Sequence, residues 1–212
     1  MSAEQLQGFF ESLTGQIVTV VVILILFGGI LISGKKRKTD TKALVLSAIF
    51  VALYLVLNQI SIFRMPQGGS ITAFSMITIT ACAYLLGTRR AVMAGMCAGL
   101  VGLIFNPYVI HPVQLLLDYP LAVGALGFAG LAGSKKYSLQ IGYLIGVFCR
   151  YLCAVLSGII FFGEYAAEGF NAFTWSIYYN ISYIGPEAVI TLLILFMPPI
   201  SKTFNRLKSQ IG

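Results

Sequence analysis

The sequence predicts an all-α integral membrane protein: a six-helix bundle with one extra transmembrane helix at its amino end. Of its 212 residues, 58% are hydrophobic and only 10% are charged, and the mean hydropathy is +0.89. The apolar residues form blocks of about 20, the length an α-helix needs to cross a bilayer, rather than the alternating ten-residue strands of an outer-membrane barrel. A cytosolic enzyme, a zinc module and a disulfide scaffold are therefore poor fits.

The first apolar block, residues 15–33, is expected to be a retained transmembrane helix. The basic run Lys35-Lys36-Arg37-Lys38 follows this block, whereas a signal peptide carries its positive charge in front, and no small-residue cleavage pattern stands out. We therefore expect residues 1–34 to form an appended transmembrane helix and residues 35–40 a basic cytoplasmic linker. Residues 41–212 then form a six-helix membrane domain.

Six further apolar blocks follow the linker. They are 41–60, 71–88, 90–105, 112–133, 139–162 and 174–200. With a rise of about 1.5 Å per residue, blocks of this length can cross a hydrocarbon core of about 30 Å. The second and third of these six are the shortest, so we expect those helices to be tilted or irregular.

The basic residues orient these spans. If successive spans cross in alternating directions, one face receives 12 of the 14 Lys and Arg residues. These are Lys35, Lys36, Arg37, Lys38, Lys42, Arg89, Arg90, Lys135, Lys136, Lys202, Arg206 and Lys208. Because cytoplasmic loops carry the excess of Lys and Arg, we expect a multi-pass protein of the bacterial plasma membrane with its amino terminus outside and its carboxyl terminus inside. The net charge of +7 is then an orientation signal, so no nucleic-acid partner is expected.

Familiar catalytic and metal-binding motifs are missing from the sequence. There is no Walker A loop, no HExxH and no nucleophile elbow. The four cysteines, Cys82, Cys97, Cys149 and Cys153, fall in predicted spans without grouped His or carboxylate residues, so packed free thiols are expected. We predict no metal, no cofactor and no enzymatic activity.

Apart from Lys42 and Arg90 at span ends, three charged residues fall inside the predicted spans: Asp118, Arg150 and Glu187. Such residues are costly in hydrocarbon and are candidates for function. Arg150 and Glu187 lie near the middle of neighbouring spans, where we expect them to form a structural ion pair. Asp118 has no obvious partner and lies about 9 Å below the outer surface by helical rise, within reach of an extracellular solute.

Two polar helix faces open toward the outer side. One is formed by His111, Gln114, Asp118 and Ala122, and the other by Ser176, Asn180, Tyr183 and Glu187, with Trp175 and Tyr179 at its border. A carboxylate, amides and aromatic rings together suit a flat organic cation. The loops 64–70 and 161–171 are candidate lids. Two plainer interpretations stay open: His111 serves only to begin its helix before Pro112, and the aromatic residues form an interfacial belt.

Three ordered blocks carry a resemblance to a known family. The blocks are Met65–Ser70, Asn106–Ala122, and Arg150-Tyr151 with Ser157–Phe162 and Tyr178–Asn180. They resemble the thiamine-specific substrate-binding component, or S component, of energy-coupling factor (ECF) transporters. The resemblance covers about residues 41–200 and leaves the first helix outside the common six-helix core.

The resemblance implies a high-affinity thiamine-binding subunit of an ATP-driven vitamin importer. Its partners would be a membrane coupling (T) protein and two cytoplasmic ATPases, and it would not hydrolyse ATP itself. The family pattern assigns Asp118 to face thiamine, Tyr108 and Tyr119 to flank it, Phe162 to an aromatic position and Asn180 to a polar contact. Ala48 and Ala52 on the first core helix are similar to the family's small-residue motif against the coupling protein.

Two departures from the family pattern leave the ligand open. The chain has Ala154 where the pattern usually has a ligand-contacting His, and Trp175 where a Tyr is usual. A related pyrimidine or thiazole compound is therefore an alternative ligand. A stand-alone secondary transporter, proton-coupled through Asp118, is a second alternative, although the sequence lacks a long inverted repeat. A membrane-embedded enzyme is a third, and one His with few carboxylates argues against it.

Overall fold

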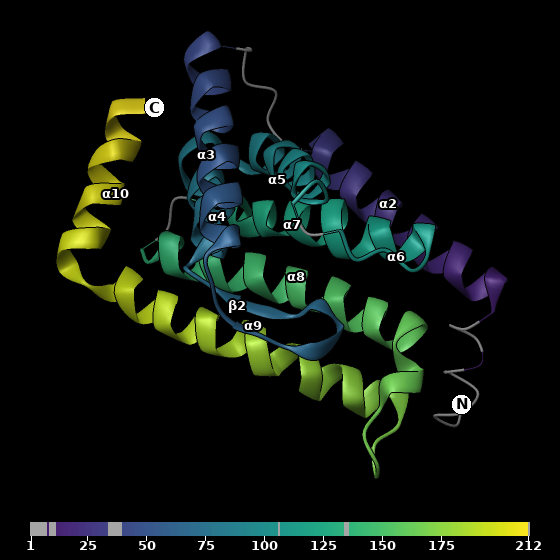
Figure 1. Ribbon diagram of the computed structural model, residues 1–212. Helices are drawn as coiled ribbons and strands as arrows, with labels where there is room; N and C mark the ends of the chain where they lie inside the picture. The colour runs from purple at the N-terminus through teal and green to yellow at the C-terminus, as the bar shows by residue number, and fades with distance from the viewer. Residues whose placement is uncertain (1–7, 9–11, 34–39, 106, 134–135, 212) are drawn as a thin grey trace.

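The computed structural model is a helical bundle with one short hairpin, and it describes residues 8, 12–33, 40–105, 107–133 and 136–211 (Figure 1). The elements in chain order are α2 (Leu13–Ser33), α3 (Thr41–Gln59), β1 (Ser61–Arg64), η1 (Pro66–Gly68), β2 (Ser70–Thr72), α4 (Ser75–Leu86), α5 (Thr88–Gly102), α6 (Pro112–Leu116), η2 (Leu117–Leu121), α7 (Ala122–Ala125), η3 (Leu126–Ala132), α8 (Ser138–Phe161), η4 (Gly163–Tyr165), α9 (Ala172–Phe196) and α10 (Pro198–Ile211).

The predicted all-α membrane class is confirmed. Among the described residues, four helices are long and apolar enough to cross a membrane: α3, the continuous helical segment Pro112–Ala132, α8 and α9. The two shortest predicted spans are α4, with 12 residues, and α5, with 15. Nearly every residue of α4 is buried by its neighbours. A helix packed inside the bundle has few side chains facing lipid, so a short length is tolerated there.

The loop after α3 is a β-hairpin rather than a simple turn. β1 and β2 pair antiparallel, with Arg64 opposite Ser70. Gln67 and Gly68 at its tip have positive φ angles of 63° and 88°, a conformation that glycine adopts without strain. The predicted lid of residues 64–70 is therefore a hydrogen-bonded hairpin that begins three residues earlier.

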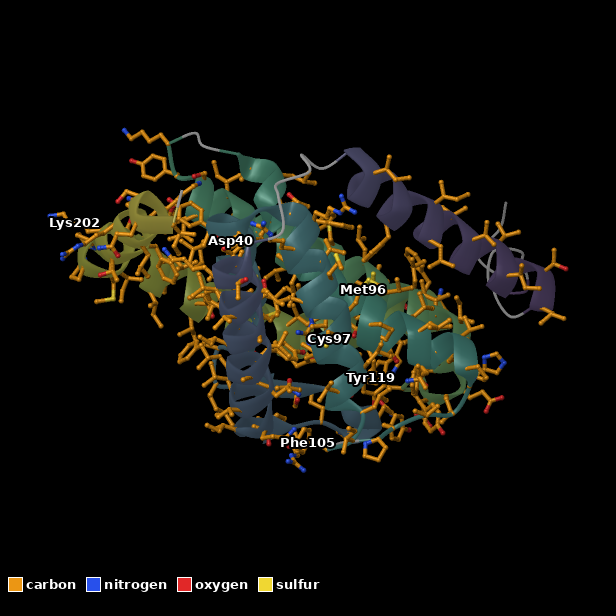
Figure 2. The ribbon with its side chains drawn as sticks, turned by 90° about the horizontal axis from the view of Figure 1, so that it is seen from above. Asp40, Met96, Cys97, Phe105, Tyr119 and Lys202 are labelled. Carbon is orange, nitrogen blue, oxygen red and sulfur yellow. The ribbon has the colours of Figure 1, made fainter. Side chains whose placement is uncertain are left out.

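The last predicted span, 174–200, is two helices. α9 ends at Phe196, and α10 begins at Pro198 after an extended residue, Met197, with ψ of 128°. A residue before proline is driven out of the helical region, which explains the break. Ile200 and Phe204 of α10 pack against the core. Figure 2 shows α10, which carries Lys202, on one flank of the bundle and α2 on the opposite flank.

α2 covers most of the first predicted span, and among its described side chains Phe27 packs on the bundle. Phe27 is 5% exposed, and its ring lies 4.7 Å from that of Phe128. Of the predicted linker 35–40, residues 35–39 lie outside the described residues. Its last residue, Asp40, caps α3 by accepting a hydrogen bond from the backbone nitrogen of Lys42 at 3.2 Å.

Candidate functional site

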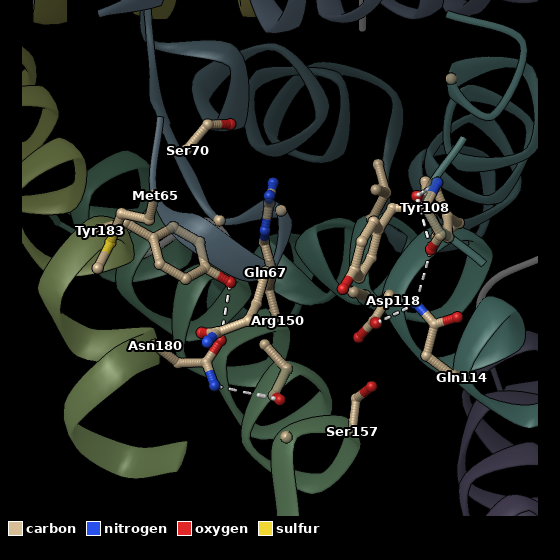
Figure 3. A pocket seen from close by; sticks show the side chains of 18 of the residues that line it. Met65, Gln67, Ser70, Tyr108, Gln114, Asp118, Arg150, Ser157, Asn180 and Tyr183 are labelled. Atoms are coloured by element: carbon tan, nitrogen blue, oxygen red, sulfur yellow. Dashed lines mark hydrogen bonds between the residues drawn. The ribbon is translucent and has the colours of Figure 1, made fainter. Parts of the chain in front are cut away.

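A cavity of about 460 Å³ lies beneath the hairpin, between the segment 107–123, α5, α8 and α9. Figure 3 shows side chains from these elements pointing into it. Its volume falls within the range of roughly 300–1,000 Å³ that is typical of small-molecule sites. Seven of the predicted substrate-binding residues line it: Tyr108, Gln114, Asp118, Tyr119, Phe162, Trp175 and Asn180.

A short π-helix carries Asp118 into this cavity. The segment Leu117–Leu121 contains Pro120 and winds more widely than the α-helical turns on either side. Proline lacks the backbone N–H that an α-helix needs, and single π turns often occur at functional sites. On α5, Gly99 allows the close approach of this segment, because a Cβ atom there would lie 2.3 Å from the carbonyl oxygen of Tyr119.

Gln114 holds the Asp118 carboxylate in place. Its Nε2 donates to Asp118 Oδ2 at 2.7 Å and to the carbonyl oxygen of Tyr108 at 3.1 Å. Its Oε1 accepts a hydrogen bond from the backbone nitrogen of Ile110 at 3.2 Å. Figure 3 shows the amide between the two residues that it joins. Both of its N–H groups are occupied, so Asp118 has one defined orientation.

The opposite wall is formed where α8 meets α9. Asn180 Nδ2 donates to the carbonyl oxygens of Ser176 at 2.9 Å and Ala154 at 3.3 Å. Its Oδ1 accepts a hydrogen bond from the Tyr183 hydroxyl at 2.7 Å. Gly158 on α8 permits the close approach of α9, because a Cβ at this position would collide with Ser176 Oγ. Asn180 therefore joins the two helices at the cavity wall.

Two buried polar atoms in the cavity lining have no hydrogen-bond partner among the described residues: Arg150 Nη1 and Ser157 Oγ. The Arg150 guanidinium lies beside the hydroxyl groups of Tyr54 and Tyr183, and Ser157 lies close to Asp118 (Figure 3). Unpaired buried polar atoms are rare and costly. They are groups that a bound molecule or water can satisfy.

Glu187 lies outside the cavity lining and anchors the hairpin. Its Oε2 accepts hydrogen bonds from the backbone nitrogen of Thr72 at 2.9 Å and the Thr72 hydroxyl at 2.8 Å. Its Oε1 accepts a longer one from the backbone nitrogen of Met76 at 3.4 Å. Among the described residues, no direct ion pair joins Glu187 to Arg150. The carboxylate instead stabilises the junction of β2 with α4.

The hairpin is fastened to α9 over the cavity. The Tyr179 hydroxyl donates to the carbonyl oxygen of Pro66 and accepts a hydrogen bond from the backbone nitrogen of Gly69 at 3.0 Å. A side chain at Gly69 would collide with the Tyr179 hydroxyl and the Tyr183 ring, both within 3.0 Å of a Cβ. The absence of a side chain there lets the backbone reach α9.

Aromatic rings frame the cavity mouth. Tyr108 and Phe162 stack with their ring centroids 6.1 Å apart and an interplanar angle of 18°. The ring centroid of Trp175 lies 5.5 Å from that of Phe170 and 6.1 Å from that of Tyr179. Aromatic faces attract cations, particularly where water is displaced. The mouth therefore adds cation-binding surface to the carboxylate inside.

Of the predicted substrate-binding residues, His111 does not line the cavity. Its Nδ1 accepts a hydrogen bond from the backbone nitrogen of Val113 at 3.2 Å, so it caps α6 before Pro112. Its ring stacks on Phe161 at 5.0 Å. Tyr54 and Asn58, which line the cavity from α3, were not among the predicted site residues. They are polar groups four residues apart on one face of a mostly apolar helix, a signal that could have identified them.

The structure also locates the remaining candidate sites. Ala48 and Ala52 are exposed on the outer face of α3. Within the described residues, no group of three or more His, Cys, Asp or Glu side chains could hold a metal ion.

The chain is similar to known proteins along most of its length. Residues 44–206 match the model of the family described as "Thiamine transporter protein (Thia_YuaJ)". The chain is 34% identical to "Thiamine transporter ThiT" of Bacillus subtilis (strain 168), over 70% of this chain and 85% of that protein. It is 28% identical to "Thiamine transporter ThiT" of Lacticaseibacillus paracasei, over 70% and 82%.

A solved structure of ThiT from Listeria monocytogenes is also similar, with a TM-score of 0.61 and 27% identity. The match covers 76% of this chain and 96% of that one. The family match begins at residue 44, so α2 lies outside it.

Proposed function

Because the chain belongs to the thiamine transporter protein family, we propose that it is the high-affinity thiamine-binding S component of an ATP-driven ECF importer. It captures thiamine on the extracellular side of the bacterial plasma membrane. It then delivers the vitamin together with a separate module of one membrane coupling protein and two cytoplasmic ATPases. The chain itself supplies binding and carries out no chemical step.

The observation that carries this proposal is the Asp118 carboxylate, fixed by Gln114 at 2.7 Å inside a cavity edged by aromatic rings. Thiamine joins a permanently positive thiazolium ring to an aminopyrimidine. A carboxylate in a partly dehydrated site attracts such a cation, and stacked rings add cation–π attraction. The unpaired Arg150 Nη1 and Ser157 Oγ are available for the uncharged heteroatoms of the ligand.

Capture in this proposal ends with closure of the hairpin. The Tyr179 and Gly69 contacts hold the hairpin over the cavity, and opening it would expose the aromatic mouth. The energising module then drives reorientation of the whole subunit. We expect the face with the excess of Lys and Arg to be cytoplasmic, with the amino terminus outside and the carboxyl terminus inside.

Calorimetric titration with thiamine, comparing wild type with Asp118→Asn, tests the carboxylate contact. Removing one partner of a buried charge pair costs about 2–5 kcal/mol, so the Kd should rise by roughly 30-fold or more. Glu164→Gln is the matched control, because it removes one negative charge from an exposed residue outside the cavity lining and should leave the Kd unchanged. An Asp118→Asn variant with the wild-type Kd would rule out the contact.

The same titration decides between thiamine and its precursors. Ala154 and Trp175 both line the cavity, so the two departures from the family pattern lie where they would contact a bound ligand. Separate pyrimidine and thiazole compounds should bind much more weakly than thiamine, because each fills part of the site. Tight binding of one fragment without thiamine binding would mean that the pocket has changed its ligand.

A further inference from the structure

A second cavity, of about 340 Å³, lies at the other end of α8. It is formed by the end of α4, the first residues of α8 and α10. Ser138 lines this cavity and Gly158 lines the first. The two positions lie about 20 residues apart on one helix, or about 30 Å, which matches the thickness of the hydrocarbon core. The two cavities therefore lie near opposite ends of α8, separated by about the thickness of the hydrocarbon core.

The lining of this second cavity is basic and rich in hydrogen-bond donors. It contains the ammonium groups of Lys136 and Lys208 and the polar side chains of Tyr84, Ser138 and Asn205. None of its described lining residues is acidic. Such a lining attracts an anion.

Contacts between α4 and α10 shape one wall of the cavity. The Tyr84 hydroxyl donates to Asn205 Oδ1 at 2.6 Å. Lys208 Nζ lies 4.0 Å from the centre of the Tyr84 ring. The second ammonium group, on Lys136, comes from the residues just before α8. The cavity therefore forms only when α10 is folded against the bundle.

The first turn of α8 adds positive potential to the same cavity. A helix leaves its first N–H groups without intrahelical partners, and its amino end carries a partial positive charge. The side chain of Tyr137, which precedes the helix, does not cap these groups. Ser138 and Gln140 are only 7% and 4% exposed and both line the cavity. Gln140 Nε2 donates to the carbonyl oxygen of Leu195 at 2.8 Å, so Ser138 and the first N–H groups of α8 are the groups suited to hold one anion.

An apolar surface leads away from the cavity along α9. Tyr137 lines the cavity, and its ring lies 6.2 Å from that of Phe196. Phe196 is 53% exposed, and Leu193, almost one turn away, is 65% exposed. A free phosphate ion would make no use of these groups, whereas a lipid has acyl chains that can lie on them.

We propose that this cavity binds the phosphate group of an anionic phospholipid, with Lys136, Lys208 and the start of α8 around the headgroup. Basic pockets between transmembrane helices on the cytoplasmic side are known lipid headgroup sites, and this end of the bundle is the one that the positive-inside rule assigns to the cytoplasm. The site is separate from the thiamine cavity, so either assignment can fail without the other.

Native mass spectrometry of the full chain tests this site. The protein is released from detergent micelles that contain equal amounts of dioleoylphosphatidylglycerol and dioleoylphosphatidylcholine. Wild type should retain one phosphatidylglycerol, and Lys136→Gln/Lys208→Gln should retain it roughly tenfold less. Lys202→Gln/Arg206→Gln is the matched control, because it removes two charges from exposed positions of α10 that do not line the cavity. Both variants should bind thiamine like wild type, which shows that they are folded.

Three outcomes would overturn the proposal. Equal retention of phosphatidylcholine, whose phosphate is balanced by a choline cation, would mean that the site does not select a headgroup with net negative charge. Equal loss in the control variant would mean that general surface charge holds the lipid. Displacement of phosphatidylglycerol by millimolar inorganic phosphate would make free phosphate the ligand.

Discussion

At the scale of single residues, Gln114 determines how the carboxylate of Asp118 is presented. The glutamine is 1% exposed, and its amide is bonded to Asp118, Tyr108 and Ile110. It does not have to touch a ligand to affect binding. Turning the Asp118 carboxylate would leave a buried N–H group unpaired, which costs about 1–3 kcal/mol.

We therefore predict that Gln114→Leu, which keeps a similar volume, weakens thiamine binding by roughly tenfold. The reason is loss of the carboxylate's fixed orientation. Calorimetry on wild type, Gln114→Leu, Asp118→Asn and the double variant forms a double-mutant cycle. If Gln114 acts through Asp118, its replacement adds little in the Asp118→Asn background. A full tenfold loss in that background would contradict the prediction.

Spacing along the sequence was enough to find residues that share one helix face. Gln114 and Asp118 are four residues apart and meet as expected. The same spacing could not identify partners that lie far apart in the chain. Glu187 was expected to face Arg150, the nearest opposite charge within the spans, but its hydrogen bonds go to Thr72, 115 residues away. Periodicity describes a helix face and says nothing about which distant backbone group reaches it.

At the scale of elements, the contact between α5 and the π-helix connects bundle packing to the site. Gly99 faces the backbone of Tyr119 and Pro120, and a Cβ at Gly99 would lie 2.6 Å from the carbonyl carbon of Tyr119. Asp118 is the preceding residue in that π-helix. A larger side chain at Gly99 would therefore move the Asp118 carboxylate as well as push α5 and the π-helix apart.

Gly99→Ala should consequently lower stability by about 1–3 kcal/mol, the usual cost of overpacking, and weaken thiamine binding as well. Thermal unfolding in detergent without ligand measures the first effect, and calorimetry measures the second. Gly102→Ala is the control, because it lies almost one turn away on α5 and its Cβ would meet only Leu55, at 3.9 Å. Equal destabilisation by both changes would show that the close approach is not responsible.

Hydropathy located the four described helices that are long and apolar enough to cross a membrane, because that property depends on composition. It did not predict the hairpin, the π-helix or α10. The hairpin depends on contacts of its backbone with Tyr179 and Glu187, and the π-helix on its packing against Gly99. The start of α10 was not predicted because the apolar block 174–200 continues through Pro198 and Pro199. The two prolines were the available signal for ending α9.

At the scale of the whole molecule, α3 presents a broad face that the bundle leaves uncovered. Leu44, Ile49, Leu53 and Val56 are 44–64% exposed on this helix, and Ala48 and Ala52 lie among them as exposed small residues. In lipid, small residues let two helices approach closely. We therefore propose that the coupling protein docks on this face of α3.

Replacing Ala48 and Ala52 with Leu should block assembly with the coupling protein and leave thiamine affinity unchanged, because neither residue lines the cavity. Copurification with the energising module, and thiamine uptake by proteoliposomes containing it, measure the loss. Cys97→Leu enlarges an exposed residue on α5 and serves as the control. Thiamine uptake by the chain reconstituted alone would instead favour a secondary transporter.

The attachment of α2 sets an order for building the protein. Phe27 packs on Phe128, which the ribosome adds about 100 residues later, or roughly 5–20 s at ordinary synthesis rates. During that interval the Phe27 ring lacks this aromatic partner. α2 therefore completes its packing only after a segment from the middle of the chain has been made.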